Sequence, residues 1–132
     1  MKIDDLIAID IHVHAEVSCR CAPDAFGREF DEAAEKYFKF THRPTIPETI
    51  ARYREKRIGL VMFTVDAEAN LGRRRIPNEE IAEAALENRD MMLAFASIDP
   101  HKGKMGVREA RRLIEDYQVA GFKFHPTVQG FY

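Results

Sequence analysis

Apolar and polar side chains alternate along residues 7–16, a pattern typical of a β-strand. Because successive strand side chains point to opposite faces, the pattern predicts two faces, with Ile9, Ile11 and Val13 on one and Asp10, His12 and His14 on the other. We expect this strand to be buried. Continuous apolar runs predict further buried strands, which gives four strands near residues 7–13, 60–65, 92–98 and 120–125.

Helix signals lie between these strands. Thr45 and Glu48 form a predicted capping box for a helix over about 46–57. Asn78 is the predicted cap of a second helix that reaches about residue 88, and an apolar stripe over 107–117 predicts a third. With right-handed crossovers, alternating strands and helices give a parallel sheet in sequence order, with the helices outside it.

The predicted fold class is α/β, of the (β/α)8 TIM-barrel type, with about the first four β/α units in residues 1–132. In such barrels the active site lies at the carboxyl ends of the strands. Polar residues end each predicted strand here: His12 and His14, Asp66, Asp99 and His125. A complete barrel needs eight units and about 250 residues, so we expect this chain to be the N-terminal half of a longer protein.

The segment over about 17–44 is longer than an ordinary connection between a strand and a helix, and we interpret it as a lid-like insertion. An apolar stripe at helical spacing predicts a short amphipathic helix within it. The stripe consists of Phe26, Phe30, Ala33, Ala34, Tyr37 and Phe38. A lid over the site and a helix that plugs one end of the core both account for it.

Composition narrows the functional classes. The chain has 132 residues, of which 45% are hydrophobic, and a net charge of -2, which indicate one globular domain without a basic surface for nucleic acid. No apolar run reaches the length of a signal peptide or a membrane span, so we expect a cytoplasmic protein with no membrane partner. Cys19 and Cys21 are too close for an ordinary framework disulfide; they are two ordinary thiols or a soft-metal pair.

The two histidines of the first strand carry the candidate chemistry. Neutral imidazole is the commonest nitrogen ligand for zinc, and two imidazoles on one strand face converge at its end. The alternative is a polar strand face that is merely wetted. No glycine-rich phosphate loop follows the strand, which disfavours a dinucleotide-binding domain.

Three motifs together resemble the N-terminal half of the amidohydrolase superfamily: Ile-Asp-Ile-His-Val-His at 9–14, Ala-Ser-Ile-Asp-Pro-His at 96–101 and Gly-Phe-Lys-Phe-His-Pro at 121–126. More narrowly, the chain resembles the amidohydrolase-related branch that contains aminocarboxymuconate semialdehyde decarboxylase and gamma-resorcylate decarboxylase. The resemblance implies that His12 and His14 bind one divalent metal, zinc or alternatively manganese. It places the remaining ligands, a His and an Asp, on a fifth and an eighth strand, which this sequence does not contain.

Further site residues are expected around this pair. We place Lys123 and His125 on one face of the fourth strand, and expect His125 to contact the substrate or to support the metal ligands. Lys123 is a possible metal bridge, because a fourth-strand lysine is carbamylated in two-metal members of the superfamily; pairing with a carboxylate such as Asp10 is the alternative. Arg43 is suited to a carboxylate substrate.

The resemblance implies metal-dependent hydrolysis or decarboxylation of a small carboxylate or carbonyl compound. We expect residues 1–132 alone to have little or no activity. One alternative is a non-catalytic half-barrel that serves folding or association, for instance as a homodimer joined through the edges of its sheet. A second is a phosphoesterase with a His-x-His metal site, although Thr64-Val65-Asp66 replaces the Thr-Asp-His that such enzymes share.

Overall fold

The computed structural model of the chain describes residues 1–22, 25–39 and 42–132. The elements in chain order are η1 (Ile3–Asp5), β1 (Ala8–His14), α1 (Ala25–Phe38), α2 (Ile46–Glu55), β2 (Ile58–Phe63), α3 (Glu68–Leu71), α4 (Asn78–Glu87), β3 (Met92–Ala96), η2 (Pro100–Lys102), α5 (Lys104–Glu115), β4 (Gly121–Phe122) and α6 (Pro126–Gln129). Within those ranges, no helix combines the length and the apolar composition that a membrane crossing needs.

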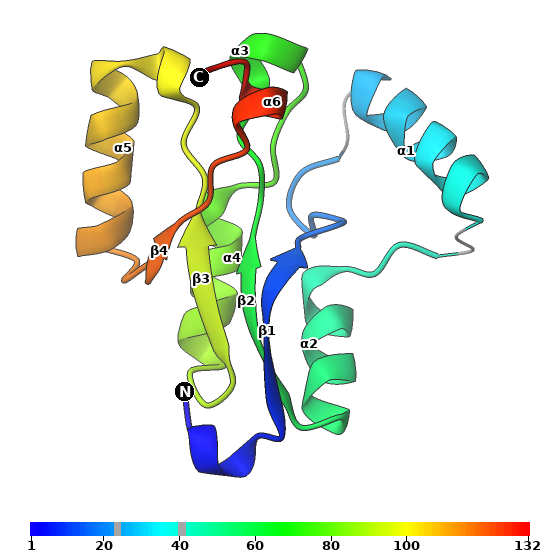
Figure 1. Cartoon of the computed structure of the whole chain (residues 1–132), viewed down its shortest axis with the longest axis vertical. Helices are drawn as coiled ribbons and strands as arrows, with labels where there is room; N and C mark the ends of the chain where they lie inside the picture. The colour runs from blue at the N-terminus through cyan, green and yellow to red at the C-terminus, as the bar shows by residue number, and fades with distance from the viewer. Residues whose placement is uncertain (23–24, 40–41) are drawn as a thin grey trace.

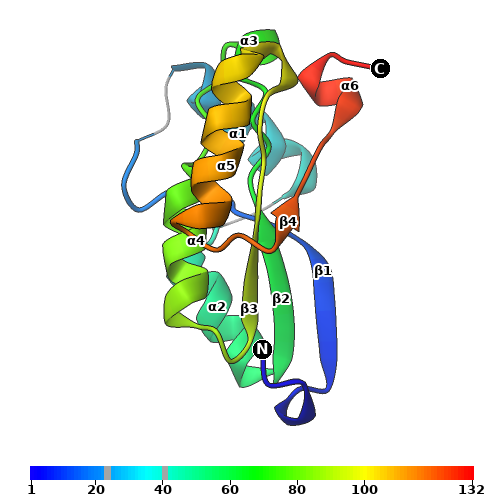
Figure 2. The ribbon, with the colours of Figure 1, turned by 90° about the vertical axis from the view of Figure 1, so that its left-hand side faces the viewer.

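The four strands form one parallel sheet in the order β1-β2-β3-β4, which confirms the predicted topology. Helices α4 and α5 cover one face of this sheet, and α2 packs beside β1 and β2 (Figures 1 and 2). None of the described helices covers the opposite face. The arrangement is that of half of a (β/α)8 barrel, in which the bare face corresponds to the barrel interior.

The core lies between the sheet and its helices. Alternate residues of β2 and β3 point into it, because a buried parallel strand presents every second side chain to the helix layer. The central members of this cluster are Leu60, Met62, Met92, Ala94, Ile81, Ile50 and Leu113, all with less than a tenth of their surface exposed. Phe63 and Val61 are buried on the other face of β2, so β2 is buried on both faces, as predicted.

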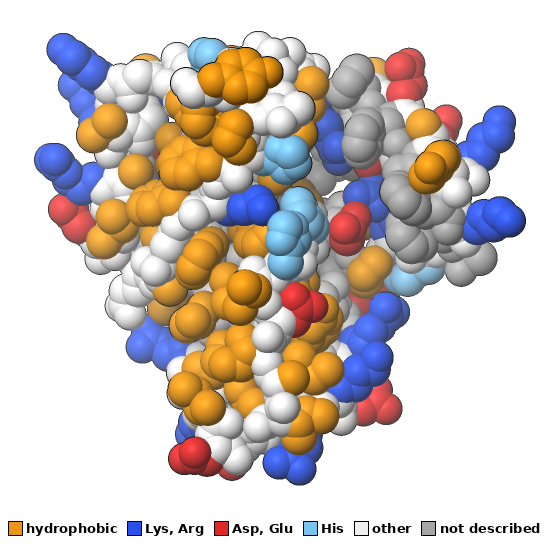
Figure 3. Space-filling model, viewed as in Figure 1, with side chains coloured by type: hydrophobic (Ala, Val, Ile, Leu, Met, Phe, Trp, Pro, Cys, Tyr) orange, Lys and Arg blue, Asp and Glu red, His pale blue; other side chains and the backbone are white. Residues whose placement is uncertain are grey.

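The prediction that β1 is buried is wrong. Ile9 is 41% exposed and Ile11 is 74% exposed, because β1 is an edge strand and no described element packs on its inner face. Apolar side chains over this bare face are visible in Figure 3 as an orange surface, with a group of pale blue His side chains near its middle. Val13, in contrast, is buried in the core.

A β-bulge explains why Val13 differs from Ile9 and Ile11. Asp10 aligns with Leu60 and Val13 aligns with Met62, so two residues of β1 oppose one residue of β2. Leu60 and Met62 both belong to the helix-side core, and Asp10 and Val13 therefore lie on that side. The prediction that Asp10 shares one strand face with His12 and His14 is therefore wrong. The extra residue at the bulge reverses the alternation between Asp10 and the two histidines.

The helix boundaries agree closely with the sequence patterns. The predicted capping box of α2 is confirmed, since Thr45 Oγ1 accepts from the Glu48 N–H and the Glu48 carboxylate accepts from the Thr45 N–H. Asn78 is not a cap. It is the first residue of α4, its side chain is buried, and its amide pairs with the backbone of Ser97 at the end of β3.

The fourth strand is shorter than expected, since β4 contains only Gly121 and Phe122. Lys123 and His125 follow it, and His125 precedes the short helix α6 instead of lying in a strand. The insertion contains helix α1 as predicted. Tyr37 of its expected apolar stripe is exposed, whereas the side chains of Phe26, Phe30, Ala34 and Phe38 lie outside the described part of the chain.

Candidate metal centre

The imidazoles of His12 and His14 meet at the carboxyl end of β1. Their Nε2 atoms are 3.2 Å apart, and their ring centroids are 5.2 Å apart. A tetrahedral zinc with Zn–N bonds of about 2.0–2.1 Å has nitrogen ligands about 3.3 Å from each other. The two side chains therefore fit two adjacent ligand positions of one zinc ion.

Phe63 holds both rings in this arrangement. It aligns with His14 across the sheet and is buried at the end of β2. Its ring packs edge-on against His12, with centroids 5.2 Å apart, and against His14, with centroids 4.8 Å apart. Lys123 Nζ lies 4.8 Å from the centroid of the same Phe63 ring, within the range of a cation–π contact. One aromatic side chain thus brings the histidines and the lysine together.

The surroundings favour the neutral form of His14, which is the form that binds metals. Burial lowers the pKa of His14, and the neighbouring His12, Lys123 and His125 act in the same direction. Glu16 opposes this shift because its negative charge favours the imidazolium. The 3.2 Å contact between the two Nε2 atoms likewise requires one of them to lack a proton.

Asp10 acts on this centre through the backbone. Its Oδ1 accepts a hydrogen bond from the His12 N–H, and its Oδ2 accepts one from the Tyr53 hydroxyl of α2 at 2.7 Å. The His12 N–H bond, followed by the Tyr53 bond, lowers the pKa of Asp10. Burial raises the pKa of Tyr53 to about 12, and the bond to Asp10 adds to the effect. Asp10 therefore fixes the bulge that precedes the ligand pair.

Glu16, Arg43 and His125 lie close to His14. His14 and His125 line one cavity of about 360 Å³ at the carboxyl ends of the strands, together with Glu16 and Arg43. Within residues 1–22, 25–39 and 42–132, no three His, Cys, Asp or Glu side chains lie close enough to form a metal-binding group. The described part of the chain accordingly offers two ligands, His12 and His14, and no third.

Arg43 is already paired. Its guanidinium binds the carboxylate of Glu16 at 2.6 Å and that of Asp31 on α1. Although burial opposes the shift, these two carboxylates raise the pKa of Arg43. Arg43 therefore links the segment after β1 to the insertion helix α1 through these two ion pairs.

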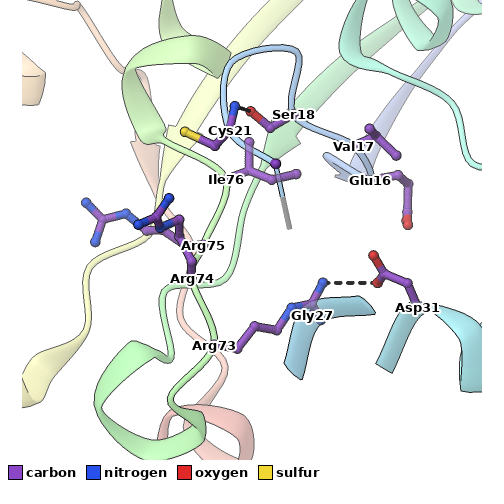
Figure 4. A pocket seen from close by; sticks show the side chains of 11 residues that line it. Glu16, Val17, Ser18, Cys21, Gly27, Asp31, Arg73, Arg74, Arg75 and Ile76 are labelled. Atoms are coloured by element: carbon purple, nitrogen blue, oxygen red, sulfur yellow. Dashed lines mark hydrogen bonds and ion pairs between the residues drawn. The ribbon is translucent and has the colours of Figure 1, made fainter. Parts of the chain in front are cut away.

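Sequence reasoning missed two charged groups at this end of the sheet. One is the set of Glu16, Arg43, Asp31 and Arg73, which joins four segments of the chain. The other is a buried network around Asp66, described below. The sequence feature that could have indicated both groups is the triplet Arg73-Arg74-Arg75 in the polar loop after β2 (Figure 4). The soft-metal alternative for Cys19 and Cys21 gains no support, since both are free thiols and neither belongs to a metal-binding group among the described residues.

Comparison with known proteins gives this geometry a family. A family model described as Amidohydrolase matches residues 9–132, which include both histidines, β1 from its second residue and the other three strands. The chain belongs to the amidohydrolase family. Comparisons with curated proteins and with solved structures returned no match. Amidohydrolases generally use divalent metals, and membership supports a metal-dependent enzyme of the hydrolase or lyase type in general.

Proposed function

We propose that this amidohydrolase is a hydrolase or decarboxylase for a small carboxylate or carbonyl compound, with one divalent metal, zinc or alternatively manganese, held by His12 and His14. The observation that carries the proposal is the 3.2 Å separation of the two Nε2 atoms, which fits one edge of a zinc tetrahedron. The resemblance to aminocarboxymuconate semialdehyde decarboxylase and gamma-resorcylate decarboxylase favours decarboxylation. A cytoplasmic location belongs to the same proposal.

A bound zinc ion would polarise a substrate oxygen and lower the pKa of a coordinated water to about 7. The protein's own side chains prepare the site for this. Phe63 restricts both imidazoles, and partial burial lowers the pKa of His14, which favours its neutral form. Asp10 orients the backbone that carries His12. Catalytic zinc sites usually have three protein ligands, and the resemblance assigns the others to a fifth and an eighth strand.

Two residues near the pair have proposed roles toward the substrate. His125 lines the cavity that His14 also lines, which supports a role in substrate contact or in supporting the metal ligands. Lys123 lies over Phe63 beside both histidines. This position is compatible with a second, bridged metal, but the cation–π contact with Phe63 accounts for Lys123 without one.

The test is metal binding by histidine variants. His12→Ala and His14→Ala should each lose most of the zinc that the wild-type chain retains after dialysis, because one remaining imidazole binds a divalent ion weakly. His42→Ala is the matched control, since His42 is exposed and its imidazole pairs with the carboxylate of Glu48. Elemental analysis gives the stoichiometry. Visible absorption of the cobalt-loaded protein reports the ligands independently of activity.

Equal zinc in the wild type and in a His12→Ala, His14→Ala double variant would overturn the proposal. The rival function, a non-catalytic half-barrel that associates, is favoured by the exposed apolar side chains of Ile9 and Ile11 on the bare sheet face. A dimer that forms without metal, and whose assembly is unchanged in both histidine variants, would support this rival.

A further inference from the structure

A completely buried glutamine lies between the carboxyl ends of three strands. Gln129 is the last residue of α6, and its side chain has no exposed surface. Its NH2 group donates to the carbonyl oxygen of Asp66 at 2.8 Å and to that of Ile98 at 3.0 Å, residues that follow β2 and β3. Its Oε1 accepts the N–H of His125, which follows β4, at 2.6 Å. One side-chain amide therefore links the ends of β2, β3 and β4.

The three partners of Gln129 match the groups of a primary amide, which has two N–H donors and a carbonyl acceptor. Both donors and the acceptor are used. The opposite orientation of the amide would place its oxygen against two carbonyl oxygens, so the contacts fix the assignment. A methionine of similar length would leave three buried backbone groups without these bonds, which is costly.

The backbone of Gln129 is tied to the same region. Its N–H donates to the carbonyl of His125 at 2.8 Å, so one residue binds His125 through both the N–H and the carbonyl. Its own carbonyl lies 3.0 Å from Nε2 of His101, which must carry the proton because a carbonyl only accepts. His101 ends the motif at 96–101, and His125 lies in the motif at 121–126. Gln129 thus joins two of the motifs by which the chain resembles amidohydrolases.

The place of His125 depends on these contacts. Helix α6 has four residues, and an isolated helix of that length is not stable in water. It lies against α3 above the carboxyl ends of β2 and β3 (Figure 1). Val128 and His125 both line the cavity of about 360 Å³ that His14 also lines. The bonds of Gln129 therefore connect this wall of the cavity to the sheet that carries the metal ligands.

We propose that Gln129 is the positioning residue of His125. It fixes the His125 backbone relative to the ends of β2 and β3, and it thereby directs the imidazole to the cavity beside His14. Because Gln129 is completely buried, it acts through His125 and not by contact with a substrate. The inference rests on the proposed function in the role given to His125 toward the substrate or the metal ligands.

Gln129→Met tests this proposal, and Asn78→Leu is the matched control. Asn78 is 1% exposed, and its amide also bonds to the backbone at the end of β3, but its partners are Ser97 and Glu109 instead of His125. Both variants lose buried amide bonds and should be less stable than the wild type. Only Gln129→Met should change the surroundings of His125, which a merely structural role would not predict.

Nuclear magnetic resonance of the metal-free chain measures the difference. In Gln129→Met, the His125 N–H should exchange about tenfold faster relative to the Leu60 N–H of β2, the fold-change to which one lost hydrogen bond corresponds. The His125 ring-proton signals should shift toward those of the exposed His42. In Asn78→Leu, the relative exchange rate and the ring signals should equal those of the wild type.

A second measurement uses only the wild-type chain, so that a variant that fails to fold does not remove the test. The His125 N–H should exchange at least about tenfold more slowly than the N–H of Thr127, an exposed residue in the first turn of α6, where helix N–H groups have no partner within the helix. Equal exchange at these two residues overturns the proposal. Unchanged His125 ring signals in Gln129→Met, or equally shifted signals in Asn78→Leu, overturn it as well.

Failure of the proposed function gives a different result. Zinc binding that survives the loss of both His12 and His14 would refute the metal site. The exchange rates and ring signals of His125 are measured without metal, so they would be unaffected, and the two failures are distinguishable.

Discussion

Replacing Asp66 by Asn should destabilise the fold strongly, because Asp66 is the centre of a buried network at the end of β2. One of its oxygens, Oδ2, accepts from Arg75 at 2.6 Å, from Lys102 Nζ at 2.6 Å and from the Asp99 N–H at 3.0 Å. Asp66 is completely buried. Its other oxygen, Oδ1, is buried and has no hydrogen-bond partner among the described residues.

The expected magnitude follows from these contacts. Bonds to a charged acceptor are worth about 1.5–3 kcal/mol and neutral ones about 0.5–1.5, so the two cationic donors together lose about 2 kcal/mol. The Asn side chain also places an NH2 group where Oδ1 has no partner, and an unsatisfied buried donor costs about 1–3 kcal/mol. The free energy of unfolding should therefore fall by about 3 kcal/mol, with Glu68 still holding Arg75 and Lys102 in part.

Urea unfolding followed by far-ultraviolet circular dichroism measures this loss. Glu79→Gln is the control, because it makes the same chemical change in the ion pair with Arg112, whose side chains are 24% and 43% exposed, and should cost less than about 1 kcal/mol. Equal losses for Asp66→Asn and Glu79→Gln would refute the reasoning. They would mean that water enters the network and satisfies the new amide.

Two other changes test separate parts of the molecule. Burial raises the pKa of Tyr53 to about 12, so the stability that its buried neutral hydroxyl contributes is complete below pH 10 and is lost as the pH rises toward 12. Absorbance at alkaline pH should show one tyrosine that ionises late in the wild type and is absent in Tyr53→Phe. Ionisation of all tyrosines near pH 10 would contradict this. Gly106→Ala in α5 should lower the melting temperature, because the added Cβ would lie 2.9 Å from Cγ2 of the core residue Ile98. Overpacking costs about 1–3 kcal/mol, whereas the gain in helix propensity is about 1 kcal/mol. A higher melting temperature would show that Ile98 can move.

The sheet order could be predicted from the sequence because its signals are local and strong. β2 is an unbroken apolar run, and the capping box of Thr45 and Glu48 defines the start of α2. Right-handed crossovers then leave one arrangement for parallel strands joined by helices. None of these inferences depends on knowing which residues far apart in the sequence meet.

The bulge in β1 could not be predicted in the same way. Alternation over 7–16 indicates a regular strand, and the break depends on a partner from elsewhere in the chain. The N–H of His12 bonds to the carboxylate of Asp10, and Tyr53 from α2 fixes that carboxylate. Beyond the end of β4 at Phe122, the side chain of Gln129 accepts the N–H of His125, a local contact that the apolar pattern of 120–125 does not indicate.

The charged groups at the carboxyl ends of the strands were the least predictable part of the site. Asp66 was expected among residues that face the site, yet it pairs with Arg75 and Lys102 inside the structure. Pairings of this kind join residues of different loops, and sequence spacing gives no information on which cation meets which carboxylate. The position of the histidine pair, in contrast, required only the strand that carries it.

Two neighbouring arginines in the loop after α3 show how the same side chain serves different purposes. Arg75 binds three carboxylates, those of Asp66, Glu68 and Glu109, and its side chain is only 14% exposed. This network fixes the loop against the ends of β2 and β3. Arg73, two residues earlier, is 30% exposed and lines the cavity shared with His14. Because Arg75 holds the loop in place, the backbone that carries Arg73 is fixed at the edge of the cavity that His14 also lines.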